Sequence, residues 1–395
     1  MVDFQTVAAI IFLVILTIFV LLKRKSLDTK QIIPYFLYFS MYKTKFGLKL
    51  MDSLAKKHKK LTLYIGYMGI LVGFVGMVLI SYALISNIYV LFTKPEASPG
   101  VGLVLPFKAK GVFYVPFFYW IISIFVIAVV HEFAHGLIAR ANNLKVKSSG
   151  FAFLGLVVPI IPAAFVEPDE KELRKRPHKE QLSVFAAGPF SNIMFAFLFL
   201  AIASFALAPI ANALIEPNGV KISGFVESEK KFPAEASGIS INEIIQQVDN
   251  YPTPYIDNLS AVLKSKKPDD IVAIKTDKSS YEVRLAKNPE NESLAYVGAY
   301  LEQSTKIKDN IKAAYGEFLP NSLIWLYGLS VILFILNLGI GLFNLVPIGP
   351  LDGGRMLQLA LHKIFNKEKG NKVWYYTGIF FLLIIFINIM FGFIK

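Results

Sequence analysis

Long apolar runs alternate with stretches rich in lysine and arginine along most of the chain. A helix rises about 1.5 Å per residue, so crossing a bilayer core of about 30 Å takes about 20 apolar residues. Apolar runs near that length predict spanning helices over residues 7–22, 61–92, 112–141, 182–213, 322–346 and 373–393. The pattern therefore predicts a polytopic α-helical membrane protein with about six transmembrane helices.

Two further segments do not fit simple spans. Residues 150–165 are apolar, but they are short, interrupted by prolines and placed between basic stretches. They predict a re-entrant or interfacial segment, with a buried helix or a β-hairpin as the alternative. In residues 34–51 aromatic side chains alternate with lysines, which favours an interfacial amphipathic segment.

Residues 214–290 have a different pattern, with short β-type runs, turns and one helical stretch. This predicts a small soluble α+β domain inserted into the membrane protein. The chain then divides into four regions: 1–111, the first helices and a basic loop; 112–213, the first part of the membrane core; 214–300, the inserted domain; and 301–395, the second part of the core with a C-terminal helix.

Composition and charge support this interpretation and give the chain an orientation. Only 17% of residues are charged, against about 25% in an average soluble domain. Lysine and arginine number eleven in residues 23–60, seven in residues 142–181 and three in residues 93–111. The positive-inside rule places the first two of these loops in the cytoplasm and the inserted domain outside the cell. The basic run after residue 22 also favours a first helix that stays as an anchor over a cleaved signal peptide.

The net charge of +13 lies in loops beside apolar runs, which favours contact with anionic membrane lipids over nucleic acid. The chain has no cysteine. Disulfides, thiolate-bound zinc and thiol catalysis are therefore excluded, and a transition-metal site must use histidine and carboxylate ligands.

The sequence HEFAH at residues 131–135 lies near the end of an apolar run. Histidines at i and i+4 share one face of a helix and can bind one Zn²⁺, while Glu132 can act on a metal-activated water. Burying His131, Glu132 and His135 in a membrane costs several kcal/mol unless they are paired or metal-bound. The alternative is a hydrogen-bonded cluster that locks helices together.

A third ligand is needed, and Asp352 in NLVPIGPLDGGR, residues 344–355, is the best candidate. Proline and glycine around it break the preceding helix and let backbone enter a cavity. An ordinary turn with an exposed aspartate is the alternative. The remaining histidines, which lie in a basic run, a charged loop and beyond the apolar turn, are not expected to be ligands: His58, His178 and His362.

HEFAH followed by Asn344, Pro347, Asp352 and Gly353 resembles the site-2 protease family of intramembrane zinc metalloproteases. AAGPFSN at residues 186–192 is similar to the G-P-x-x-N segment of that family. The inserted domain resembles a PDZ domain over FPAEASGISINEIIQQVDN, residues 232–250. It departs from the PDZ pattern at Asn242–Glu243 and at Asn250.

The resemblance implies that His131, His135 and Asp352 bind Zn²⁺ and that Glu132 is the general base and acid. A neutral donor for the tetrahedral intermediate is expected from Asn344 or Asn192.

The resemblance further implies transmembrane protein substrates cleaved within the cell membrane in regulated intramembrane proteolysis. The active site is expected toward the cytoplasmic side, and residues 150–165 are expected to bind an unwound substrate as an added strand. The PDZ-like domain is expected to be extracytoplasmic, with a peptide as its ligand.

Two other functions remain open from the sequence. A metalloprotease that cuts outside the bilayer usually takes its third ligand from a glutamate on a later helix, and neither downstream apolar run contains one. A non-catalytic scaffold with a structural zinc would need no base beside the metal, so Glu132 disfavours it.

Overall fold

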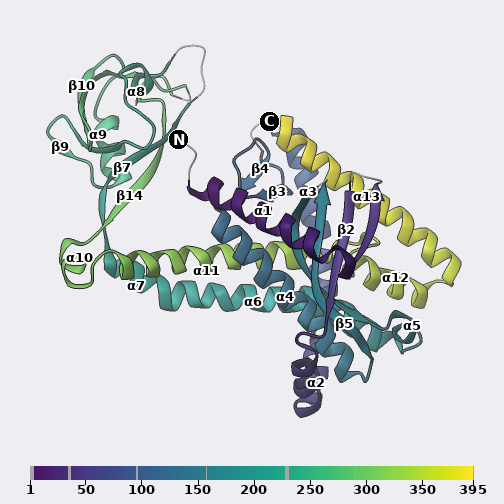
Figure 1. Cartoon of the computed structure of the whole chain (residues 1–395). Coiled ribbons are helices and arrows are strands. Elements are labelled where there is room, and N and C mark those ends of the chain that lie inside the picture. Colours follow the sequence, from purple (N-terminus) through teal and green to yellow (C-terminus); the bar gives the residue numbers. More distant parts are fainter. Residues whose placement is uncertain are drawn as a thin grey trace. The chain divides into compact units, whose positions relative to one another are not determined.

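The computed structural model describes residues 4–33, 37–94, 97–156, 158–226, 231–289 and 291–394 (Figure 1). The chain forms two compact units. The membrane unit combines Met1–Ala203 with Gly328–Lys395, and the inserted unit is Ser204–Tyr327.

Six helical spans in the described residues are long and apolar enough to cross a membrane, which confirms that part of the prediction. Many of their large apolar side chains are exposed, as expected for a surface in contact with lipid. The spans are α1 (Phe4–Lys23), α3 (Lys59–Thr93), α4 (Phe117–Ala141), α6 (His178–Ala201) continued through a π-helical segment (Ile202–Leu207) into α7 (Ala208–Leu214), α11 (Phe318–Phe343) and α13 (Lys367–Ile394).

One span begins later than predicted and another ends earlier, and proline explains both differences. Helix α4 begins at Phe117 after Pro116, while Val112–Tyr114 forms strand β4, paired in parallel with β3 (Leu103–Leu105). Helix α11 ends at Phe343, shortly before Pro347. Proline disfavours helical geometry in the residue before it and has no N–H to donate.

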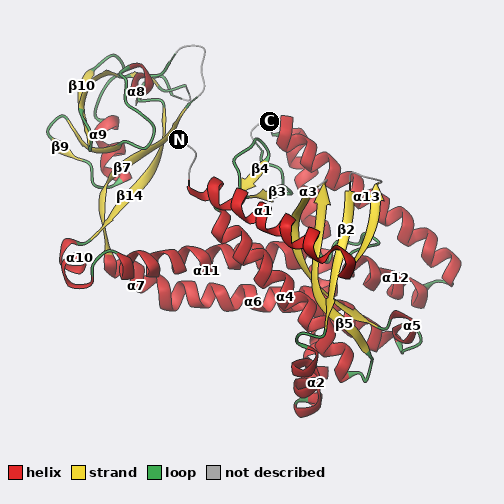
Figure 2. Cartoon of the chain, viewed as in Figure 1, coloured by secondary structure: helices red, strands yellow, loops and turns green. Residues whose placement is uncertain are grey.

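A four-stranded antiparallel sheet accompanies the helices of the membrane unit, in the order β1-β2-β5-β6 (Figure 2). Its strands are β1 (Leu27–Ile33), β2 (Leu37–Thr44), β5 (Val146–Leu156) and β6 (Val158–Pro168). The apolar segment 150–165 is thus the β-hairpin of β5 and β6, with Gly150 opposite Phe165; residue 157 lies outside the described residues.

The amphipathic segment 34–51 contributes β2 and the start of helix α2 (Leu48–Lys57), and its residues 34–36 lie outside the described part. Strand β2 pairs with β1 on one side and β5 on the other. Two pieces of the amino-terminal region are therefore built into the sheet that carries the hairpin.

Strand β6 forms one edge of this sheet. Helix α4 packs against this strand. Three prolines lie in β6, at positions 159, 162 and 168. Proline cannot donate to a ladder and is therefore found on edge strands. The residues that follow β6 form the short helix α5 (Glu170–Leu173) before α6 begins.

The inserted unit contains both strands and helices, as the α+β prediction expects. Its sheet has the order β11-β10-β8-β7-β14, and β9 pairs with β8. Val220, Ile245, Leu259 and Ile274 are fully buried in its core. The strands are β7 (Ile215–Phe225), β8 (Ile244–Val248), β9 (Tyr251–Pro252), β10 (Ile271–Thr276), β11 (Ser280–Arg284) and β14 (Ala299–Ile307), with a small pair β12 (Ala286–Lys287) and β13 (Ala295–Tyr296); the helices are α8 (Pro233–Ala236), α9 (Ile256–Lys264) and α10 (Asp309–Tyr315).

Candidate metal centre

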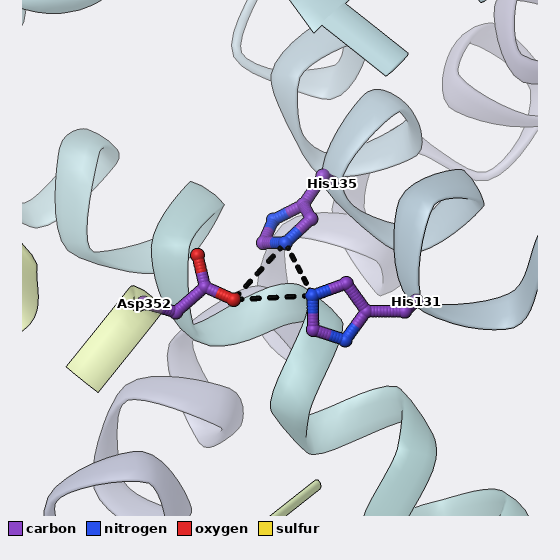
Figure 3. A group of neighbouring side chains, drawn as sticks. All are labelled: His131, His135 and Asp352. Atoms are coloured by element: carbon purple, nitrogen blue, oxygen red, sulfur yellow. Dashed lines mark hydrogen bonds and ion pairs between the residues drawn. The ribbon is translucent and has the colours of Figure 1, made fainter. Parts of the chain in front are cut away.

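Helix α4 presents its two histidines on one face, one turn apart. The Nε2 atoms of His131 and His135 lie 3.1 Å apart, and each side chain is only 12% exposed (Figure 3). Two imidazole nitrogens this close inside a membrane-length helix form a pair of potential metal ligands.

Asp352 completes the group from a distant part of the sequence. It is the first residue of helix α12 (Asp352–Ile364), and its Oδ2 lies 3.1 Å from His131 Nε2 and 3.3 Å from His135 Nε2 (Figure 3). A carboxylate is favoured at a helix N-terminus because the unpaired N–H groups there carry partial positive charge. The turn and the helix thus present the carboxylate toward α4.

The glycines after Asp352 allow this turn to be tight. A Cβ on Gly353 would lie closer than 3.0 Å to the Leu345 carbonyl oxygen, and one on Gly354 would meet the Ile348 carbonyl equally closely. The Gly353 amide also donates to the Asn344 carbonyl at 2.8 Å. The helix break predicted around Asp352 lies between α11 and α12, and its tight turn brings Asp352 close to the end of α11.

Helix α6 also contacts both histidines. Nδ1 of His135 lies 2.7 Å from the Val184 carbonyl oxygen, which can only accept, so Nδ1 carries the proton and Nε2 is free to bind a metal. The amide Nδ2 of Asn192 lies 3.2 Å from His131 Nδ1. Asn192, an oxyanion candidate from the sequence, is thus placed beside a ligand.

The Glu132 side chain is bonded to the sheet of the membrane unit. Its Oε2 accepts a 2.9 Å hydrogen bond from the backbone amide of Val166 in β6. The side chain follows His131 directly on α4, so it remains beside the candidate ligands while it is oriented by the edge strand.

The other oxyanion candidate, Asn344, donates its side-chain Nδ2 to the Ile340 carbonyl of its own helix at 3.0 Å. Its role in catalysis stays a prediction. Of the remaining histidines, His362 lies 2.8 Å from Asn371 Oδ1. Among the described residues, the group that could bind a metal does not include His58, His178 or His362.

The donor set fits a divalent transition metal. One ligand atom from each of His131, His135 and Asp352 can be chosen so that all lie within 4.8 Å of one another. Two imidazoles and one carboxylate are a set found in catalytic zinc sites, where a fourth position stays open, and cobalt would also suit them.

The sequence profile of Peptidase family M50 matches residues 119–385, from α4 to α13. The chain belongs to this family. This match confirms the resemblance to site-2 proteases. Peptidase family M50 is a metallopeptidase family. This M50 chain is also 26% identical over 357 residues to an uncharacterized protein of Methanocaldococcus jannaschii, an alignment that covers 88% of the chain and 82% of the relative.

Three contacts of this M50 site were not predicted from the sequence. They are the Val184 carbonyl at His135, the Val166 amide at Glu132, and the approach of Gly188 to both histidines. Two involve backbone atoms, which every residue carries. Gly188 stands in the G-P-x-x-N segment, in which the sequence assigns a role to Asn192 but none to the glycine.

Proposed function

We propose that this M50 peptidase is a zinc endopeptidase that hydrolyses peptide bonds in or near transmembrane segments of membrane proteins. One observation carries the proposal: Glu132 follows His131 in the sequence of a membrane-length helix, and that helix supplies both histidines of a His-His-Asp group. A structural metal site needs no such carboxylate.

Zinc, when bound by His131, His135 and Asp352, supplies a Lewis acid and makes water a stronger acid near neutral pH. Glu132 takes the proton of the attacking water and returns it to the amine that leaves. The amide of Val166 holds one oxygen of Glu132 and leaves its other oxygen for this transfer. Asn344 is the proposed donor to the oxyanion.

Strand β6 is the proposed docking edge for the substrate backbone. The Val166 N–H donates to Glu132 of helix α4, which shows that it points away from β5. Backbone N–H and C=O groups alternate in direction along an antiparallel strand. The backbone groups of Ala164 and the carbonyl of Pro162 therefore face the same side as the Val166 N–H, away from β5. A substrate segment that loses its helical hydrogen bonds can replace them by adding to this edge.

An apolar cavity of about 360 Å³ lies beside the same strand. It is lined by Phe12 of α1, Phe125 of α4, Phe151 of β5 and Ala164 of β6. Phe125 lies two turns before Glu132 on α4. Such a cavity suits apolar side chains, which supports a transmembrane segment as the substrate.

The inserted unit is proposed to be an extracytoplasmic PDZ-like domain that takes a peptide ligand. Asn242 stands where PDZ domains have glycine and adopts φ +72°, a conformation that asparagine tolerates better than other side chains. We propose that this unit limits access until another protease has shortened the substrate, with the metal centre toward the cytoplasm.

The test compares the wild-type protein with Glu132→Gln in liposomes that contain a panel of single-span membrane proteins. Glu167→Gln is the matched control, because Glu167 follows Val166 on β6 and pairs with Ser148 and Lys43 outside the metal group. The proposal requires cleavage by wild type and Glu167→Gln and none by Glu132→Gln. Cleavage by Glu132→Gln at the wild-type rate would contradict it.

The same experiment distinguishes the proposed protease from a non-catalytic scaffold. A scaffold with structural zinc would bind metal in all three proteins and cleave no substrate in any of them. Metal content is therefore measured alongside cleavage.

A further inference from the structure

Three positions on helix α6 face the two histidines at successive turns. Val184, Gly188 and Asn192 are spaced by four residues, so they share one face of the helix. Val184 meets His135, Asn192 meets His131, and Gly188 lies between them beside the Nε2 atoms of both.

Gly188 leaves the space that the donor atoms need. A Cβ built there would lie closer than 3.0 Å to Nε2 of His131 and of His135. Real Cβ atoms essentially never approach other atoms so closely. The Nε2 atoms are those that also meet Asp352. Any side chain at this position would push the donor atoms apart.

Asn192 is buried with 0% exposure, and its Oδ1 has no hydrogen-bond partner among the described atoms. Burying an unpaired polar atom costs about 1–3 kcal/mol. The contact that offsets this cost is the one to His131 Nδ1. A histidine that binds a metal through Nε2 carries its proton on Nδ1, and that N–H needs a hydrogen-bond acceptor. The two ends of an amide are nearly isosteric, so Asn192 can turn its oxygen to Nδ1.

We propose that Asn192 is a positioning residue that accepts the Nδ1 proton of His131, as the Val184 carbonyl does for His135, and that Gly188 keeps the space between them. The two acceptors hold both imidazoles with Nε2 toward Asp352. This role rests on the proposed metal centre, and it differs from that of an oxyanion donor because it acts on metal affinity before any substrate is present.

The test measures metal binding by the full chain in detergent without substrate. Asn192→Leu removes the acceptor at similar volume, whereas Asn192→Asp retains one. Asn337→Leu is the matched control: Asn337 is also fully buried in a membrane-length helix, its Oδ1 has no partner among the described residues, and its amide Nδ2 donates to Leu333 of its own helix. The readouts are the dissociation constant for Zn²⁺ against a competing chelator and the visible spectrum of bound Co²⁺.

Asn192→Leu should weaken Zn²⁺ binding about 10- to 100-fold, the range usual for partners of metal ligands, and should alter the Co²⁺ spectrum. Asn192→Asp and Asn337→Leu should stay within a few-fold of wild type. Unchanged affinity and spectrum in Asn192→Leu would overturn the proposal while leaving the protease function standing. An equal loss in Asn337→Leu would also overturn it, because packing alone would then explain the effect.

Gly188→Ala tests the space between the histidines. Its matched control is Gly339→Ala, since a Cβ on Gly339 of α11 would meet no atom of the described residues within 4 Å. Gly188→Ala should lose Zn²⁺ binding with its helix content and elution volume preserved, whereas Gly339→Ala should bind as wild type does. Wild-type affinity in Gly188→Ala would contradict the proposed spacing. A wild-type protein that takes up no metal would end both this proposal and the proposed function.

Discussion

The backbone amide of Val166 donates a 2.9 Å hydrogen bond to Oε2 of Glu132, and so joins the edge strand β6 to the carboxylate beside the metal centre. The strand proposed to align the substrate is thus also the strand that orients the proposed base. Because both functions depend on one edge, a change in β6 should affect the rate of the chemical step as well as substrate binding.

Val166→Pro removes the amide while it keeps an extended backbone on an edge strand that already contains proline. Hydrogen bonds to charged groups contribute about 1.5–3 kcal/mol, so kcat should fall about 10- to 100-fold. Val166→Ala keeps the N–H and is the control, with kcat near wild type. The measurement is steady-state cleavage of one membrane substrate at saturating concentration, and an unchanged kcat in Val166→Pro would show that the hydrogen bond does not orient the base.

Removal of the metal should abolish cleavage reversibly. A chelator should inactivate the protein, and added Zn²⁺ or Co²⁺ should restore it. Asp352→Asn should bind Zn²⁺ more than about 100-fold less tightly, since losing a ligand exceeds the loss of a ligand's partner. Asp309→Asn, a change at an exposed carboxylate of the inserted unit, should have no effect. Full activity of metal-free protein would refute the assigned ligand set.

The candidate ligands could be predicted from the sequence because their chemistry is costly in a membrane. The i, i+4 spacing of His131 and His135 places both on one helix face, and the glycines around Asp352 indicate a break where backbone turns back. The structure brings these three residues together across more than two hundred positions of sequence. No spacing rule contains that distance. Asp352 is a candidate from the sequence because its turn follows an apolar run, and the family resemblance supports the same choice.

Other parts were ambiguous for physical reasons. A short apolar run such as residues 150–165 has no periodicity that distinguishes a re-entrant segment from a hairpin. The pairing of β5 with β6 shows the hairpin, and β2, more than a hundred residues earlier in the chain, pairs with β5. The side-chain amide of Asn344 could face either the cavity or its own helix, and the structure shows its Nδ2 bonded to Ile340.

The inserted unit should lose stability in acid through Glu243. Although burial raises its pKa, hydrogen bonds from Thr276, the Ser240 amide and Tyr281 hold the pKa of Glu243 below its usual value of 4.5. A lowered pKa means that this carboxylate stabilises the fold fully above about pH 4.5 and loses that contribution as the pH falls through the folded value.

Hydrogen exchange in the inserted unit of the full chain, corrected for the intrinsic rate at each pH, measures this effect. Glu243→Gln should cost about 1–3 kcal/mol at pH 7 and flatten the acid dependence, because charged hydrogen bonds are lost. Glu282→Gln, at an exposed position of β11, should behave as wild type. Equal acid dependence in all three proteins would exclude Glu243 as the source.

Removal of the inserted unit tests its proposed role in access. Pro217 and Thr305 are partners across β7 and β14, so an Asn-Gly turn can replace residues 218–304. Cleavage of substrates with long ectodomains should rise toward the rate for short ones. A constant ratio between long and short substrates would mean that the unit does not select by size.

The position of the cleaved bond tests the central claim most directly. Products of one single-span substrate, made by the wild-type protein and by Glu132→Gln in liposomes, are mapped by mass spectrometry. The proposed function predicts new termini within the apolar segment from the wild type alone, with equal metal content in both proteins. Termini confined to the exposed flanks of the substrate would contradict intramembrane cleavage and assign the metal centre to a protease that cuts outside the bilayer.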